Sequence, residues 1–490
     1  MNVLTQILEK HWGFLALIIW IAICLFAKLV GLDPFGIDEQ AARGLLLNWS
    51  ISDNIINPIV IFGVPDFRAL LFVPIGAYWP GSMLAAKILT LLITFSAATL
   101  LYRWSKKTTN KETALIASAL FLISPFLLNQ IDSIGAAPFI LLGMALGAWL
   151  DNAYRNKEQY FGGWYFVQLL WITILLTLHP VALAYPLAIA WQWYKNPPPN
   201  KNSRHMYVGL VLATLFSMAL RTGWESIAWL ANPVQALAIA LDGGVLWSLQ
   251  DIQWLPAVIA AIVLITLIIV DKKFLTTDLL GLMLLIAILI GLFAADSVWA
   301  SIACCLVLYR GVHHLIRLNS QIKKHNLLGQ RGIVIGVTFV MSLYFMAQDK
   351  THALTNIRAT LSPEDQVIQR LAEEAADQDK PFRAASQWPA RSMLASRRDV
   401  LPLPPPIEDT EQFKHSIAGL THLIFDQKSV KNQHLVNNLT QLTGRTETLA
   451  LLKGGVVIEN REHNVELSAG HRTDPDKQNN KPIAESEQQE

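Results

Sequence analysis

The chain has 490 residues, of which 53% are hydrophobic and only 16% are charged, and its formal net charge is +2. Repeated apolar runs of about 15 to 20 residues match the thickness of a bilayer, which predicts a polytopic membrane protein and excludes an ordinary soluble globule. The nearly neutral charge gives no indication of nucleic-acid binding. All three cysteines lie inside apolar runs, so no disulfide framework is expected.

The first apolar run, from Trp12 to Val30, follows Lys10 and is too long for a cleaved signal peptide, so it is interpreted as an uncleaved signal anchor. Hydropathy predicts about eleven membrane spans in total. They lie near residues 12–31, 82–102, 113–128, 136–150, 163–178, 179–194, 206–222, 254–270, 277–293, 297–310 and 332–347. Connections rich in lysine and arginine alternate along these spans, and the positive-inside rule then places the N-terminus in the cytoplasm. Loop 32–81 and everything after Gln348 are expected outside.

Two apolar segments do not fit this count. The run Ala69 to Trp79 is short and contains Pro74, which favours an interfacial or re-entrant helix over a span. The segment 232–250 is interrupted at Asp242 and is interpreted as an external re-entrant element. The alternative, a true span, would turn the later basic connections outward.

Beyond Gln348 the composition becomes polar, which indicates a domain boundary. We predict an all-α membrane domain at 1–348, a small extracytoplasmic α/β domain at 349–463 and a disordered tail at 464–490. The elements expected in the α/β domain are a helix beginning near Ser362, strands at 382–385 and 421–425, a helix at 430–442 and a hairpin at 449–458.

The loop after the first span, residues 32–81, is unusually long and acidic for a connection between two spans. Long ordered loops are often functional. If its first part is helical, Glu39 and Arg43 pair across one turn, which leaves Asp38 to face elsewhere. Two interpretations stay open for Asp38, because an aspartate at this position can be a catalytic carboxylate or can simply cap the helix.

The order of residues in this region has a counterpart in a known family. The pattern Asp38-Glu39-x3-Arg43-x5-Trp49 is followed by Gly63-Val64-Pro65-Asp66-Phe67-Arg68, a short apolar helix and Ala85-Ala86-Lys87. This arrangement resembles the GT-C membrane glycosyltransferases, and in particular the branch of the aminoarabinose transferases of lipid A and the protein O-mannosyltransferases. The layout of the later spans and the hydrophilic domain after the last span are similar as well.

The resemblance implies that a sugar moves from a polyprenyl-phosphate carrier to a lipid, glycan or protein acceptor at the periplasmic face of a bacterial inner membrane. It places the catalytic carboxylate at Asp38, with Glu39 beside it. A transfer with a phosphate leaving group needs a general base and cations that hold the phosphate. Arg43 and Arg68 are the candidate cations. No cofactor is identified, and the acidic pair is compatible with a divalent metal.

The chain departs from the family pattern at three places. Arg68-Ala69 stands where the family has Lys-Pro, and arginine and lysine bind phosphate with different geometry. Gly135-Ala136-Ala137-Pro138 stands where many relatives carry an acid. Asp132 either substitutes for that acid in substrate binding or is an ordinary turn residue. His179 occupies the place of a family lysine, and it is either a substrate-binding or a structural residue.

Two other functional classes are alternatives to the enzyme. A transporter or flippase of lipid-linked sugars is expected to carry internal repeats and ionisable residues in the middle of its spans. Here the spans are nearly free of charges other than Lys28 and Lys87, and no repeat between the halves is visible. A catalytically degenerate relative that acts as a scaffold of the cell envelope would account for the missing acid near Ala136. The sequence does not specify the sugar or the acceptor.

Overall fold

The computed structural model describes part of the chain. The described residues are 37–52, 67–68, 71–72, 75, 83–107, 109, 111–154, 163–196, 203–222, 265, 277–293, 298–314, 336, 338–341, 343, 363–378, 381–407, 409–425, 432–442, 446–451 and 456–460. The chain divides into two compact units, Met1–Ser362 and Pro363–Glu490. The predicted boundary at 348 falls in a segment outside the described residues.

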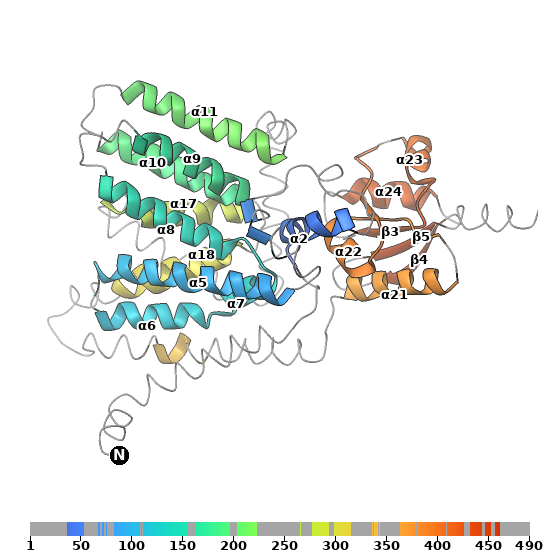
Figure 1. Ribbon diagram of the computed structural model, residues 1–490, viewed down its shortest axis with the longest axis horizontal. Helices are drawn as coiled ribbons and strands as arrows, with labels where there is room; N and C mark the ends of the chain where they lie inside the picture. The colour runs from blue at the N-terminus through green and yellow to red at the C-terminus, as the bar shows by residue number, and fades with distance from the viewer. Residues whose placement is uncertain are drawn as a thin grey trace, which may run out of the picture. The chain divides into compact units, whose positions relative to one another are not determined.

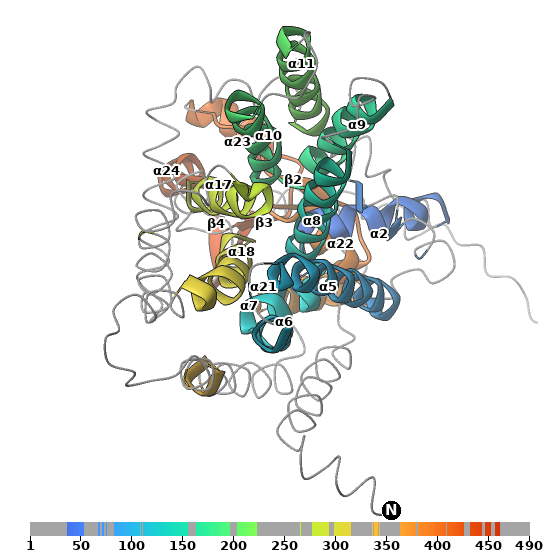
Figure 2. The same ribbon diagram turned by 90° about the vertical axis from the view of Figure 1, so that its left-hand side faces the viewer.

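The first unit is helical. Its longer described helices are α5 (Met83–Lys106), α6 (Lys111–Leu122), α8 (Ala137–Tyr154), α9 (Gly163–Leu178), α10 (Ala184–Lys195), α11 (Ser203–Thr222), α17 (Leu279–Phe293) and α18 (Val298–Leu306). Helix α5 packs against α6 and α8, helix α9 against α11, and helix α17 against α10 and α18. Figure 1 shows these helices running side by side, and Figure 2 shows them closer to end-on.

Among the described residues, one helix is long and apolar enough to cross a membrane, Leu84–Lys106, and a bent pair formed by Thr113–Leu122 and Pro125–Ile131 counts as a second if it is one span. The other apolar helices found there are shorter, at 10–17 residues. The predicted spans at 12–31, 254–270 and 332–347 lie wholly or largely outside the described part. The count of about eleven spans therefore stays a prediction.

In the structure, the predicted span 113–128 is not one continuous helix but is broken near its end. Ser124 caps a new helix, α7 (Pro125–Asp132), by accepting a hydrogen bond from the Leu127 backbone N–H at 3.3 Å. Pro125 occupies the first helical position, where its missing N–H costs no hydrogen bond. The chain consequently turns by 51° between the two helices. Figure 1 shows that α7 then leads into α8 at the same end of this unit as α2.

The outward faces of several helices are apolar. Leu92 on α5, Phe166 on α9 and Leu212 on α11 are 58%, 68% and 60% exposed. Large apolar side chains in such numbers are unfavourable in water but are the expected outer surface of helices in lipid. The helical unit is therefore that of a membrane protein.

One part of the helical unit contains a buried ion pair. After α18 the chain continues as a π-helical turn, η4 (Val307–Gly311), which contains Arg310. The Arg310 Nε lies 3.3 Å from Asp278 Oδ2, and Trp104 Nε1 donates to Asp278 Oδ1 at 2.9 Å. These contacts join the end of α5, the start of α17 and η4. In the sequence Arg310 is the first of the basic residues that follow the predicted span 297–310, and the structure buries its side chain.

The second unit contains a five-stranded sheet with the strand order β2-β1-β3-β5-β4. The strands are β1 (Ala384–Ser386), β2 (Val400–Pro402), β3 (His422–Phe425), β4 (Thr446–Leu451) and β5 (Val456–Asn460). Strands β2, β1 and β3 are parallel, whereas β5 is antiparallel to both β3 and β4. Its helices are α21 (Pro363–Asp377), α22 (Pro389–Ser396), α23 (Thr410–Ile417) and α24 (Gln433–Gln441).

The core of this unit lies between the sheet and the helices α23 and α24. Phe413 and Ile417 of α23 and Leu435 of α24 are buried together with Leu423 and Phe425 of β3. The helix expected from Ser362 corresponds to α21, and the hairpin expected at 449–458 corresponds to β4 and β5. Strand β2 and helices α22 and α23 have no counterpart in the sequence-based expectations. The tail 464–490 lies outside the described part.

Candidate functional site

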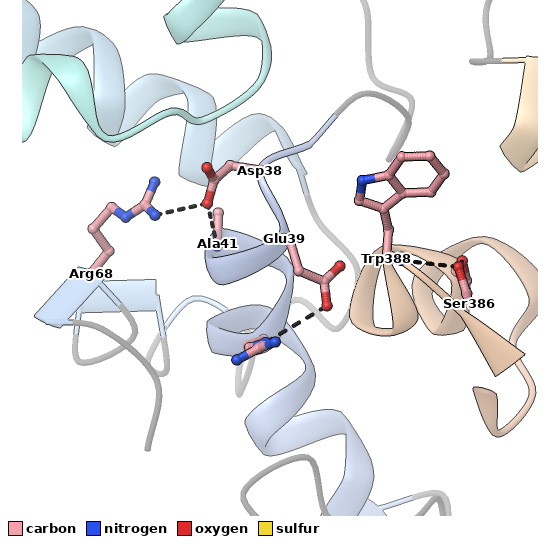
Figure 3. Close-up of polar contacts among 8 residues, drawn as sticks. Asp38, Glu39, Ala41, Arg68, Ser386 and Trp388 are labelled. Carbon is pink, nitrogen blue, oxygen red and sulfur yellow. Dashed lines mark hydrogen bonds and ion pairs between the residues drawn. The ribbon is translucent and has the colours of Figure 1, made fainter. Parts of the chain in front are cut away.

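The first residue of the site is Asp38, which lies just before helix α2 (Glu39–Ser52). Its Oδ1 accepts a hydrogen bond from the Ala41 backbone N–H at 3.2 Å, the third residue of the helix. This is the geometry of an N-cap, in which a side chain satisfies one of the unpaired N–H groups at the start of a helix. The capping interpretation of Asp38 is therefore correct as far as it goes (Figure 3).

The same carboxylate also binds Arg68, which is distant in sequence. Arg68 Nη2 donates to Asp38 Oδ1 at 2.7 Å, and Arg68 Nη1 donates to the Ile134 carbonyl oxygen at 2.8 Å. The Arg68 side chain is 1% exposed, whereas the Asp38 side chain is 34% exposed. The cation is thus held inside the protein, whereas its carboxylate partner is partly exposed. Figure 3 shows the two side chains pointing toward each other.

A third contact closes the site. The backbone N–H of Asp38 donates to the Ser133 carbonyl oxygen at 2.7 Å. Ser133 and Ile134 directly follow α7, so one short turn binds both the backbone of Asp38 and the guanidinium of Arg68. The structure therefore brings together two predicted site residues, Asp38 and Arg68, that lie 30 positions apart in the sequence.

Glu39 and Arg43 form the ion pair that the helical spacing predicts. Arg43 Nε lies 3.6 Å from Glu39 Oε1, one turn along α2, and the two side chains are partly exposed. Figure 3 shows Glu39 at the start of α2, below Asp38. Such a pair on a partly exposed helix face contributes little to stability. Arg43 therefore pairs with Glu39 on α2, the helix that Asp38 caps.

The two remaining predicted residues take different positions. Asp132 is the last residue of α7, directly before the Ser133 and Ile134 carbonyls of the site. His179 begins the short 3-10 helix η2 (Pro180–Leu183), where its Nδ1 accepts from the Val181 backbone N–H at 3.2 Å. The hydrogen bond of His179 is structural. A role of either residue in substrate binding stays a prediction.

A divalent metal was compatible with the acidic pair in the sequence. Within the part of the chain that the structure describes, no group of three histidine, cysteine, aspartate or glutamate residues is close enough to hold a metal ion. The Asp38 oxygen that faces inward binds the Arg68 cation instead. Among the described residues, Asp38 and Glu39 are thus not joined by a third side chain of these types, and a divalent metal stays a prediction.

The sequence predicted a short turn at Asp132 but not that the backbone of this turn holds the site. Its contributions come from backbone carbonyls, which every residue carries, so no residue type identifies them. Ile134 has a φ of 55°, in the left-handed region that is unusual for a branched side chain. The one available signal was Gly135 after a short helix, since glycine often follows a helix end. Gly135, however, lies one residue after Ile134, the residue that has the left-handed conformation.

Comparisons with known proteins show similarity in fold. No family model matches the chain, and no curated protein matches its sequence. The solved structure of the Archaeoglobus fulgidus oligosaccharyltransferase, tethered to an acceptor peptide containing the NVT sequon, is 11% identical, with a TM-score of 0.50 over 86% of this chain and 70% of that chain. ArnT from Cupriavidus metallidurans, bound to undecaprenyl phosphate, is 10% identical, with a TM-score of 0.47 over 91% and 98%.

A third solved structure, the arabinofuranosyltransferase AftD from Mycobacteria, is 12% identical, with a TM-score of 0.35 over 90% of this chain and 40% of that chain. All three proteins are GT-C glycosyltransferases. At these identities the similarity concerns the fold alone, and the oligosaccharyltransferase comparison is the one that carries it. The resemblance to GT-C glycosyltransferases predicted from residues 36 to 87 is confirmed at that level.

Proposed function

We propose that the chain is an integral membrane glycosyltransferase, which moves a sugar from a polyprenyl-phosphate donor to a lipid, glycan or protein acceptor at the periplasmic face of a bacterial inner membrane. Three observations support the proposal: the GT-C-like fold, the motif from Asp38 to Lys87 and the ion pair at its centre. The ion pair carries the proposal, because it joins the two groups that this reaction needs, a base and a cation.

Asp38 is assigned the role of general base. The acceptor hydroxyl gives its proton to the Asp38 carboxylate while its oxygen attacks the anomeric carbon of the sugar. The bond between that carbon and the phosphate oxygen breaks, and its electron pair leaves with the polyprenyl phosphate. The 34% exposure of the Asp38 side chain supports this role, since an acceptor must reach the carboxylate from outside.

Arg68 is assigned to the phosphate. Its planar guanidinium carries five donors, and such groups bind phosphate oxygens through charge-assisted hydrogen bonds. In the structure described here, Asp38 occupies the Arg68 Nη2 donor. If the phosphate of the sugar donor replaces Asp38 in this contact, Arg68 neutralises the charge of the leaving group. The Asp38 carboxylate is then released toward the acceptor. Donor binding and activation of the base are then one event.

The neighbouring residues have supporting roles in this proposal. Arg43 lies on α2 one turn beyond Glu39 and supplies a second positive charge on the helix that Asp38 caps. Glu39 holds that arginine in place. Asp132 and His179 are kept as candidate contacts to the donor or the acceptor, with Asp132 nearest to the ion pair in the chain trace.

One observation favours the alternative of a non-catalytic scaffold. Asp38 Oδ1 already has two structural partners, the Ala41 N–H and the Arg68 guanidinium. An ion pair that merely fixes α2 to the helical unit would use the same contacts. The exposure of Asp38 does not fit this alternative well, because a purely structural pair is usually more stable when both partners are enclosed and hydrogen-bonded.

The test is mass spectrometry of envelope glycolipids and glycoproteins from a strain that lacks the gene. We expect a sugar-sized mass to disappear from one class of molecule in the deletion strain and to return with the wild-type gene. Asp38→Asn should not restore it, because the amide can still cap α2 but cannot accept the proton.

The matched control is Asp409→Asn. Asp409 also caps a helix, α23, by accepting from the Glu411 N–H at 3.0 Å, and it lies in the other unit of the protein. This variant should restore the missing sugar. Restoration by both variants would assign Asp38 to capping alone, and an unchanged glycan profile in the deletion strain would argue against transfer altogether.

A further inference from the structure

The turn between α7 and α8 has the hydrogen bonds of a Schellman motif, a common way to end a helix. The Gly135 N–H donates to the Gln130 carbonyl at 2.7 Å, and the Ile134 N–H donates to the Ile131 carbonyl at 3.3 Å. In this motif the residue in the left-handed conformation is usually glycine. Here that residue is Ile134, with a φ of 55°, and glycine follows it.

An isoleucine in this conformation is unfavourable, because its branched side chain crowds the following carbonyl. Such residues persist where the surrounding structure holds them, and they occur often at functional sites. Ile134 is fully buried, and its carbonyl oxygen is the one that accepts from Arg68. The strained residue therefore points its backbone acceptor at the proposed phosphate-binding cation.

Gln130 supports this turn from two sides. Its backbone carbonyl accepts from Gly135, and its side-chain Oε1 accepts from the Ala137 N–H at 3.3 Å, at the start of α8. The carboxamide reaches Ala137 by passing over Gly135, where an added Cβ would lie only 2.0 Å from the Gln130 Oε1. Glycine is thus needed at 135 to make room for the glutamine, and Gln130 is 6% exposed.

We infer that Gln130 is a positioning residue, which fixes the α7–α8 turn so that the Ile134 carbonyl holds the Arg68 guanidinium ready for the phosphate of the donor. The inference rests on the proposed function. It adds to that function a residue that acts on Asp38 and Arg68 through the backbone of the α7–α8 turn.

The test measures binding of undecaprenyl phosphate to the purified full-length protein in detergent by native mass spectrometry. Gln130→Met keeps the size of the side chain and removes its acceptor. One neutral hydrogen bond corresponds to about a threefold to tenfold change in an equilibrium constant, so we expect affinity to fall by that factor. Gln130→Glu should retain most of the affinity, because a carboxylate oxygen can accept from Ala137 and is favoured at a helix N-terminus.

A matched control uses a second buried glutamine of the same unit. Gln168 on α9 is 2% exposed and donates to Asp151 at 3.0 Å, in contacts that do not involve the turn. Gln168→Met should lower thermal stability in the same way and leave phosphate affinity within about twofold of wild type. An equal loss of affinity in this control would reduce Gln130 to a general structural residue and overturn the inference.

A double-mutant cycle separates positioning from stability. If Gln130 acts through Arg68, Gln130→Met should change affinity by less than about twofold once Arg68→Met has removed the guanidinium. An equal loss in both backgrounds would overturn the inference. Wild-type affinity in Arg68→Met would place the phosphate elsewhere and overturn it too, while leaving the donor class intact. A wild-type protein that does not bind undecaprenyl phosphate would reject the proposed donor, and with it this inference.

Discussion

Within the described residues of the helical unit, two aspartate–arginine pairs are built alike. Asp38 caps α2 through the Ala41 N–H at 3.2 Å and pairs with Arg68 at 2.7 Å. Asp278 caps α17 through the Gly281 N–H at 3.1 Å and pairs with Arg310 at 3.3 Å. In each pair, one carboxylate begins a helix and binds a buried arginine from a distant part of the chain.

The two pairs differ in exposure. The side chains of Asp278 and Arg310 are 11% and 8% exposed, and Trp104 donates a further hydrogen bond to the same carboxylate. Asp38 is 34% exposed although Arg68 is buried more deeply than Arg310. An enclosed pair with additional partners can only hold helices together, because breaking it leaves a charge in an apolar environment. A pair open on its carboxylate side can exchange that partner for a ligand.

The largest expected effect is on the open pair. Asp38→Asn should lower transfer by about 10² to 10⁴, the usual contribution of a positioned general base. Its free energy of unfolding should fall by less than in the enclosed pair, because asparagine still caps α2 and water reaches the partly exposed position of Asp38, although the buried Arg68 loses its counter-charge. Turnover by reconstituted protein and thermal unfolding of the same preparation provide the two measurements. Wild-type turnover would make the two pairs equivalent and both structural.

The same substitution in the enclosed pair should act on stability. Asp278→Asn leaves the Arg310 guanidinium buried without its counter-charge, and breaking such a pair costs about 3 to 5 kcal/mol. We expect a lower unfolding temperature in detergent and a reduced yield of folded protein. Replacing both partners, with Asp278→Leu and Arg310→Met, should recover part of the loss, since apolar residues can substitute for a buried pair. Unchanged stability in the single variant would show that the enclosed pair does not hold the helices together.

Acid should destabilise the α/β unit through a buried histidine. His422 on β3 lies beside Thr421 and the Phe382 ring, and burial lowers the pKa of its imidazole from 6.5 to about 4. The unfolded chain then binds more protons than the folded chain between those values. Stability is therefore fully present above pH 6.5 and is lost as the pH falls toward about 4.

The measurement is the unfolding temperature of the full-length protein between pH 7.5 and pH 4, compared with His422→Phe. The variant should show a shallower decline, because phenylalanine has no proton to gain. The difference between the two profiles then measures the contribution of His422. Identical pH profiles for both proteins would indicate that His422 titrates normally.

The smallest effect is expected at Glu39. Its pair with Arg43 is partly exposed and 3.6 Å long, so Glu39→Gln should cost less than about 1 kcal/mol of stability and leave most of the transfer activity. The assay is the one used for Asp38→Asn. A loss close to that of Asp38→Asn, together with sensitivity to chelators, would instead assign Glu39 to a metal or to direct control of the Asp38 carboxylate.

Local features of the site were predictable from the sequence. The cap at Asp38 and the pair between Glu39 and Arg43 follow from the spacing of residues within one helical turn. The apolar runs likewise predicted most of the described helices, because the pattern that indicates a helix depends on residues close together in the chain. Asp38 and Arg68 were each identified as candidates, although nothing in the sequence paired them.

The tertiary structure decided which of these residues meet and how they are enclosed. The contact from Arg68 to Ile134 spans 66 positions, and it uses a backbone carbonyl that no residue type reveals. Arginine is a residue type that usually lies at the surface, yet the packing of α5, α17 and η4 buries Arg310 against Asp278. Residue identity determines which charges the chain carries. Only the packing of distant segments determines which charged side chain is buried and which stays accessible to a substrate. The reason is that desolvation depends on all the atoms that surround a group.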